Sequence, residues 1–145
     1  MSAAIQPITP SSRLTQFLAA CDLPVADIGQ SDALHFFAQE IDGKLCGVVG
    51  LELYPPFALL RSLAVAPHYR GCGLGRALVA FAEQHAVARG IDTLFLLTTT
   101  AAPFFAALGY TNAARSEAPA AIRSTAQFSE LCPASSSFMA KFLRT

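Results

Sequence analysis

One stretch of the sequence constrains the fold more than any other, because an apolar strand runs through a glycine-rich loop directly into a helix. The strand covers residues 58–66, and the loop, residues 70–76, reads Arg-Gly-Cys-Gly-Leu-Gly-Arg. The helix then extends to Arg89, where a basic residue followed by Gly90 suits a helix C-terminus. A second apolar run over 93–98 completes a strand–helix–strand unit, whose two strands we expect to be parallel.

The other elements follow from periodicity and turn signals. The helix after the loop is expected to bury one stripe, formed by Leu74, Ala77, Leu78, Phe81 and His85. Asp42-Gly43 is a strong hairpin signal between two strands. The remaining expected elements are an edge strand at 3–8, a helix capped by Ser11 or Ser12 that buries Leu14, Phe17 and Leu18, strands at 33–41 and 44–53, a short helix around Pro103 that ends at Gly109, an irregular segment at 115–134 with a helical turn near 120–128, and a strand at 136–143. The pattern predicts an α/β (α+β) fold in a single domain, 1–145, with a mixed, mostly antiparallel sheet.

Composition restricts the class of protein. Apolar residues make up 53% of the chain and charged residues 14%, which indicates a well-buried core. The formal net charge is zero, so the positive charge typical of nucleic-acid-binding proteins is missing. No apolar run is long enough to span a membrane and no secretory leader is seen, so we expect a cytoplasmic protein without nucleic-acid or membrane partners.

The cysteines form no metal-binding or disulfide pattern. Cys21, Cys46, Cys72 and Cys132 are far apart, and none is part of a C-x-x-C pair. We therefore expect reduced thiols rather than a disulfide framework or a zinc site. The high apolar fraction is compatible with a homodimer and equally with a well-packed monomer.

The glycine-rich loop has the chemistry of an anion site. Gly71, Gly73 and Gly75 let the backbone approach a ligand closely, and the helix N-terminus favours negative charge. Arg70 and Arg76 would add charge-assisted hydrogen bonds or else point to solvent. A Rossmann fingerprint needs a third glycine where Arg76 stands, and a Walker loop needs a Gly-Lys-Ser/Thr ending; neither occurs. A purely structural turn needs fewer glycines, so a phosphate site is the favoured interpretation.

The pattern Arg70-x-x-Gly73-x-Gly75, after an apolar Leu63-Ala64-Val65 strand, resembles the acyl-CoA motif of the GNAT superfamily of N-acetyltransferases. The segment 102–110 resembles the second helix of that family, which flanks the CoA thiol. The resemblance implies a GNAT fold over most of the chain, acetyl-CoA as cosubstrate, no metal, and a strand N–H facing the thioester carbonyl. The cofactor-binding residues that it implies are Leu63, Ala64, Val65, Arg70, Gly71, Cys72, Gly73, Leu74, Gly75, Arg76, Phe104 and Phe105.

Further stretches narrow the resemblance. Residues 53–57, 62–70 and 95–105 look like the acetyltransferase domain of N-acetylglutamate synthases. The tail, at 117–123 and 130–136, looks closer to small stand-alone GNAT proteins associated with bacterial arsenic resistance. Both resemblances imply a small-molecule acceptor with an amino-acid-like amine, and some of the arsenic-resistance proteins acylate an arsenic-containing glutamate analogue.

The sequence departs from the family at Phe105, where many GNAT enzymes carry a tyrosine that protonates the leaving thiolate. Phenylalanine cannot donate a proton, so another group or water would serve. A thiolate is a stable enough leaving group near neutral pH that a dedicated acid is not obligatory. The favoured activity is direct acetyl transfer to an amine, and the alternative is an acyl-CoA-binding module without turnover.

An amino-acid acceptor needs partners for its carboxylate and a base for its ammonium. We predict that Tyr54, Arg61, Arg123 and Ser135 bind the acceptor. For Arg61 the alternative is a structural ion pair, for Arg123 a solvated surface position, and for Ser135 a polar strand start. Glu52 is the predicted general base, because its apolar neighbours indicate burial. An outward-facing Glu52 and a water path to solvent are the alternatives to that assignment.

Overall fold

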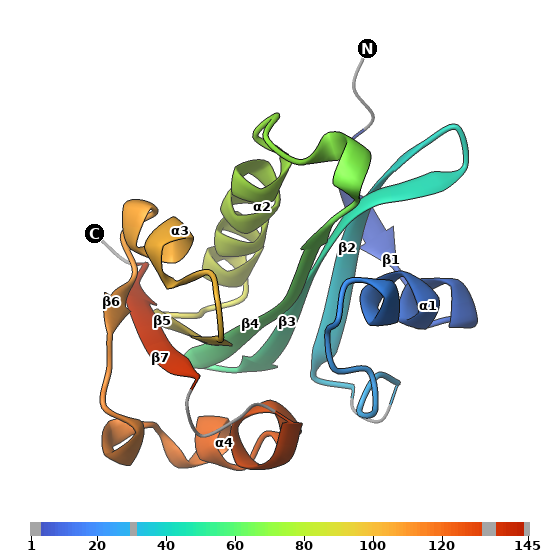
Figure 1. Cartoon of the computed structure of the whole chain (residues 1–145). Helices are drawn as coiled ribbons and strands as arrows, with labels where there is room; N and C mark the ends of the chain where they lie inside the picture. The colour runs from blue at the N-terminus through green and yellow to red at the C-terminus, as the bar shows by residue number, and fades with distance from the viewer. Residues whose placement is uncertain (1–3, 30–31, 132–135, 144–145) are drawn as a thin grey trace.

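The strand–loop–helix unit forms at the centre of the molecule (Figure 1). The computed structural model describes residues 4–29, 32–131 and 136–143. In it β4 (Phe57–Val65) leads through a short helical turn into α2 (Leu74–Ala88), which is followed by β5 (Thr93–Thr98). These strands belong to a seven-stranded sheet of order β1-β2-β3-β4-β5-β7-β6. Among the strand pairs of these described residues, only that of β4 with β5 is parallel, so the predicted mixed sheet and parallel pair are confirmed.

Most of the other expected elements lie within one or two residues of the predicted ranges, but β1 begins only at Gln6, the expected turn near 120–128 is two separate elements, and β6 was not predicted. At α1 the Ser11 hydroxyl accepts a hydrogen bond from the N–H of Leu14 at 3.2 Å, as an N-cap does. At the hairpin Asp42 and Gly43 both adopt positive φ, 53° and 77°, as a type I′ turn requires. The remaining elements are β1 (Gln6–Ile8), α1 (Ser12–Ala20), β2 (Leu34–Ile41), β3 (Lys44–Tyr54), η1 (Pro67–Tyr69), α3 (Ala102–Ala107), β6 (Thr111–Asn112), η2 (Arg115–Glu117), α4 (Ala120–Arg123), η3 (Gln127–Leu131) and β7 (Ser137–Phe142).

Helices cover the two faces of the sheet unequally. The larger apolar cluster joins α2 to one face, and α1 and α4 cover the other face through two smaller clusters. The predicted stripe of α2 is partly wrong, because Ala77 is exposed while Phe81 and His85 are only half-buried. The residues that α2 buries are Leu74, Leu78, Val79, Ala82 and Ala86. The helix is therefore rotated relative to the expected stripe.

The sheet opens between β4 and β5. Phe57–Leu60 of β4 pairs with Thr93–Leu96 of β5, and the pairing of these two strands stops there. Beyond this point β4 continues to Val65 along β3, and β5 continues to Thr98 along β7. A β-bulge lies at the start of the opening, where the β3–β4 register shifts and Ser62 adopts a left-handed φ of 56°. A bulge increases the local twist of its strand, which turns the end of β4 away from β5.

Candidate active site

The opening between β4 and β5 is a cleft of about 500 Å³. Its two long walls are the diverging strand ends, Leu60–Val65 and Leu96–Thr98. Arg70 lies along the cleft on the side of the glycine-rich loop. The remaining lining residues come from the loop after α1, the β5–α3 connection, α3, the segment after α4 and the residue before β7. They are Cys21, Asp22, Leu23, Pro24, Thr99, Thr100, Ala101, Phe105, Gln127 and Ser136.

The glycine-rich loop lies at the end of the cleft where α2 begins. Arg70 donates from Nε to the carbonyl oxygen of Val65 at 2.9 Å, which ties the loop to the end of β4. Gly73 has φ 87° and forms the N-cap of α2, a helix of 15 residues. The first N–H groups of a helix have no intrahelical partner, so those of Leu74–Arg76 are available to an anion. The loop backbone, Arg70 and the exposed Arg76 are thus gathered at this end.

Aromatic side chains form part of the wall beside α3. Phe105 is buried, lines the cleft, and meets Phe104 edge-on at 5.1 Å between ring centroids. Phe104 in turn packs over the first turn of α2, because a Cβ placed on Gly75 would lie 3.5 Å from its Cζ. The hydroxyl of Tyr110 donates to Glu83 at 2.8 Å, and burial is the main cause that raises the pKa of Tyr110. Among the described residues that line the cleft there is no tyrosine.

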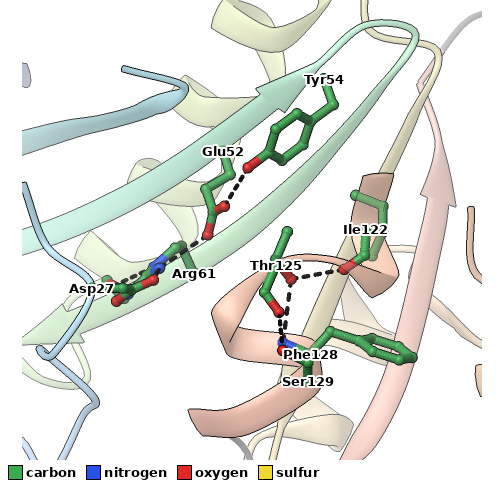
Figure 2. Close-up of polar contacts among 9 residues, drawn as sticks. Asp27, Glu52, Tyr54, Arg61, Ile122, Thr125, Phe128 and Ser129 are labelled. Carbon is green, nitrogen blue, oxygen red and sulfur yellow. Dashed lines mark hydrogen bonds and ion pairs between the residues drawn. The ribbon is translucent and has the colours of Figure 1, made fainter. Parts of the chain in front are cut away.

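A chain of buried polar groups lies on the sheet face opposite α2 (Figure 2). Arg61 donates from Nη1 to Glu52 at 3.0 Å and forms a two-oxygen ion pair with Asp27, with Nη2 donating to Oδ1 at 2.7 Å. The other Glu52 oxygen accepts from the hydroxyl of Tyr54 at 2.8 Å. The Arg61 Nε donates to the Ser62 hydroxyl at 3.1 Å.

The balance of effects on Arg61 keeps it charged. Burial lowers the pKa of Arg61, but the hydrogen bonds and charges of Asp27 and Glu52 outweigh burial, so the pKa is raised above its ordinary value. The Arg61 side chain is 0% exposed in solvent-accessible area, although atoms of the residue form part of the cleft wall. Glu52 and Tyr54 lie behind Arg61 and are not among the lining residues.

The roof of this end of the cleft comes from the segment after α4. The Thr125 hydroxyl donates to the carbonyl of Ile122 at 2.7 Å and accepts from the N–H of Phe128 at 3.2 Å. Ser129 adds a hydrogen bond from its hydroxyl to the Thr125 carbonyl at 2.9 Å, as Figure 2 shows. These bonds fix a segment without a long helix in one conformation, and Gln127 from it lines the cleft.

Of the predicted acceptor-binding residues, Arg61 lines the cleft, whereas Tyr54 and Arg123 do not. Arg61 lines the cleft and also forms the structural ion pairs that were its alternative. Arg123 is exposed, donates from Nε to the Ala118 carbonyl at 3.2 Å, and is not among the lining residues. Ser135, like Cys132, lies outside the described residues.

Several cleft residues were missed by the sequence reasoning. Asp27, which does not line the cleft itself but binds Arg61 beside it, was also missed, because its connecting loop carries no sequence motif. The three threonines Thr98–Thr100 at the end of β5 could have been predicted to line the cleft, because small molecules bind at the carboxyl ends of parallel strands. Gln127 and Ser136 line the cleft because of how the C-terminal segment folds back in three dimensions, which no local sequence pattern indicates.

Cys21, Cys46 and Cys72 are free thiols. Across residues 4–29, 32–131 and 136–143 no three His, Cys, Asp or Glu side chains are placed to hold a metal ion. None of the helices in these ranges combines the length and apolar character needed to cross a bilayer.

Comparison with known proteins agrees with this geometry. The model of the acetyltransferase (GNAT) family matches residues 6–110, and the chain belongs to this family. An uncharacterized N-acetyltransferase of Chlorobaculum tepidum is 36% identical over 76 residues, which are 52% of this chain and 48% of that protein. An amino-acid acetyltransferase of Ralstonia nicotianae is 33% identical over 92 residues, which are 62% of this chain and 20% of that protein. The chain thus matches about half the length of the first relative and a fifth of the second.

Solved structures share the fold. One is N-acetylglutamate synthase from Neisseria gonorrhoeae, complexed with coenzyme A and N-acetyl-glutamate. It superposes with a TM-score of 0.79 at 21% identity, and the superposition covers 100% of this chain and 36% of that chain. A GNAT acetyltransferase from Staphylococcus aureus gives a TM-score of 0.73 at 17% identity and covers 97% of this chain and 100% of that chain. The predicted GNAT fold is confirmed.

Proposed function

We propose that this protein transfers an acetyl group from acetyl-CoA directly to the amine of an amino acid or an amino-acid analogue. The observation that carries the proposal is the cleft between β4 and β5, with the glycine-rich loop at one end and the buried Arg61 cluster at the other. The amino-acid acetyltransferase relatives support an acceptor of this class.

Acetyl-CoA would bind at the loop end of the cleft. The pyrophosphate would accept hydrogen bonds from the loop backbone and from the first turn of α2, with Arg70 and Arg76 adding positive charge. The pantetheine arm would extend along Leu63–Val65, and Phe104 and Phe105 would pack beside the thiol. This arrangement leaves the acetyl group near the bulge in β4.

The reaction would proceed by direct attack of the neutral amine on the thioester carbonyl carbon. A C–N bond forms, the C–S bond breaks, and the CoA thiolate leaves. The proton that the attacking nitrogen loses as it becomes an amide passes through water to the thiolate. A backbone N–H near Leu63–Val65 would stabilise the negative charge on the carbonyl oxygen. Holding both substrates in one cleft would supply much of the acceleration.

The acceptor would occupy the other end of the cleft. Its carboxylate would bind Arg61, and its ammonium would lose a proton to Glu52. Because Glu52 lies behind Arg61, a water molecule would carry the proton between them. Tyr54 would orient the Glu52 carboxylate, while Arg123 and Ser135 stay predicted acceptor contacts of the tail.

An acceptor screen tests the proposed function. The full chain is incubated with acetyl-CoA and a panel of amino acids, including glutamate and its phosphono and arseno analogues, and free CoA thiol is measured. Thiol release that depends on one class of amino acid is the expected result. Preference for an arsenic-containing glutamate analogue would extend the proposal to arsenic resistance.

A second candidate function is an acyl-CoA-binding module without turnover. Phe105 favours it, because this side chain lines the cleft in the place of a proton-donating tyrosine. Tight acetyl-CoA binding together with no thiol release on any member of the panel would replace the enzyme by this module.

A further inference from the structure

The two carboxylates that hold Arg61 are fixed in different ways. Glu52 belongs to β3, its side chain is 5% exposed, and its second oxygen is bound by Tyr54. Asp27 belongs to the loop between α1 and β2, and its side chain is 13% exposed. Residues 21–24 of the same loop line the cleft. Asp27 is therefore the partner of Arg61 that lies on the more adaptable element, close to the cleft.

Asp27 occupies the edge of the Arg61 guanidinium that offers N–H groups from both Nη atoms. Its Oδ1 accepts from Nη2 at 2.7 Å and its Oδ2 accepts from Nη1. This two-oxygen fork is the geometry that carboxylates prefer on a guanidinium. The other N–H groups of Arg61 that the structure assigns go from Nε to Ser62 and from Nη1 to Glu52. A second carboxylate cannot form the same fork while Asp27 holds it.

Charge also favours exchange over addition. The cluster contains one guanidinium and two carboxylates, all largely buried. A ligand that simply added its carboxylate would place a third negative charge beside a single buried cation, which a low-dielectric site opposes. A ligand that replaced Asp27 would leave the charges of the cluster unchanged.

We propose that Asp27 is a specificity-determining residue that competes with the carboxylate of the acceptor for Arg61. An acceptor with a carboxylate displaces Asp27 and takes over its two hydrogen bonds, whereas a simple amine has no group with which to displace it. The inference rests on the proposed function for its choice of ligand. Because only the fraction of molecules with Asp27 displaced binds the acceptor, the contact weakens the measured affinity for every carboxylate ligand.

Calorimetry with L-glutamate tests the competition. L-glutamate is titrated into the full chain saturated with CoA, for the wild type, Asp27→Asn and Asp32→Asn. Asp32 is a matched control, since it is an exposed aspartate of the same loop that does not line the cleft. Asp27→Asn is expected to bind L-glutamate about three- to tenfold more tightly, because a neutral amide competes less well for the guanidinium. Asp32→Asn should match the wild type. Equal or weaker binding by Asp27→Asn overturns the proposal.

Arginine labelling tests the same exchange without any acceptor. Phenylglyoxal reacts with accessible guanidinium groups, and the modification of Arg61 is followed by peptide mass spectrometry in the same three proteins. Labelling several-fold faster in Asp27→Asn than in the wild type and Asp32→Asn supports the exchange. Equal rates contradict it. If Asp27→Asn is labelled faster but none of the three proteins binds L-glutamate, L-glutamate is rejected as the acceptor and the exchange is retained. The acceptor screen then tests the proposed function by itself, so the two proposals fail separately.

Discussion

The Arg61 guanidinium lies between two carboxylates on a sheet face that is otherwise apolar. Leu59 and Ala64, its neighbours along β4, belong to the two apolar clusters beneath α4 and α1. Removing one partner from such a buried pair generally costs about 3–5 kcal/mol, because the other charge is left uncompensated. An alanine at position 61 would therefore mix a loss of stability with a loss of acceptor binding, and a substitution that keeps the charge is more informative.

Arg61→Lys separates the two effects. Lysine preserves a cation beside Glu52 and Asp27 but loses the planar fork that binds a carboxylate with two parallel hydrogen bonds. We expect the acceptor KM to rise about tenfold, the effect of roughly one charge-assisted hydrogen bond, while the KM for acetyl-CoA stays the same. Arg89→Lys, an exposed change at the end of α2, is the control and should alter neither constant. A change confined to the acetyl-CoA KM would remove Arg61 from the acceptor site.

The Arg61 cluster could be predicted from the sequence only in part. Arg61 and Glu52 stand out because they are charged residues within apolar strands. Their contact depends on the β3–β4 register, in which Gly50 faces Arg61 and Glu52 faces Leu59. Asp27 gives no signal, because aspartate is ordinary in a loop. Its approach to Arg61 follows from how that loop packs in three dimensions.

At the scale of elements, α2 packs unusually closely against β3 at Gly47. A Cβ on Gly47 would lie 2.8 Å from Cδ1 of Leu78 and 3.0 Å from Cδ2 of Leu74. This contact also explains which face of α2 is buried. The helix carries alanines on several sides, so apolar periodicity alone does not define its inner face, and the gap left by a glycine in the neighbouring strand decides it.

Gly47→Ala is expected to destabilise the protein by about 1–3 kcal/mol, because the added methyl group overpacks the β3–α2 contact. Urea unfolding followed by circular dichroism measures the change. The cost should largely vanish when Leu78→Ala supplies room for the methyl group, so the two changes should be strongly non-additive. A Gly47→Ala protein with the unfolding midpoint of the wild type would show that the two elements do not pack this closely.

At the scale of the whole molecule, the cleft joins segments that are far apart in the sequence. The strand–loop–helix unit could be predicted because its signals are local: an apolar strand, glycines, and a helical period. The acceptor end could not, since it combines residues 21–24, the bulged part of β4, the end of β5 and the tail around Gln127. Their assembly depends on the divergence of β4 from β5, which one bulge at Ser62 accompanies and which no local pattern specifies.

We propose that the glycine-rich loop binds the pyrophosphate of acetyl-CoA, and the substitution Gly73→Glu tests this assignment. Position 73 has φ 87° and no atom within 4 Å of an added Cβ, so the glutamate would place negative charge in the anion site without a steric clash. Gly90→Glu is the matched control, because Gly90 has φ 81° and equally open surroundings at the opposite end of α2. Both variants therefore carry a similar backbone strain.

Calorimetric titration of acetyl-CoA into the three proteins gives the answer. We predict that Gly73→Glu lowers the affinity for acetyl-CoA at least about tenfold, since charge repulsion replaces charge-assisted hydrogen bonds at the helix N-terminus. Gly90→Glu should bind as tightly as the wild type. Equal affinities for acetyl-CoA in Gly73→Glu and Gly90→Glu would contradict the assignment of the loop as the pyrophosphate site.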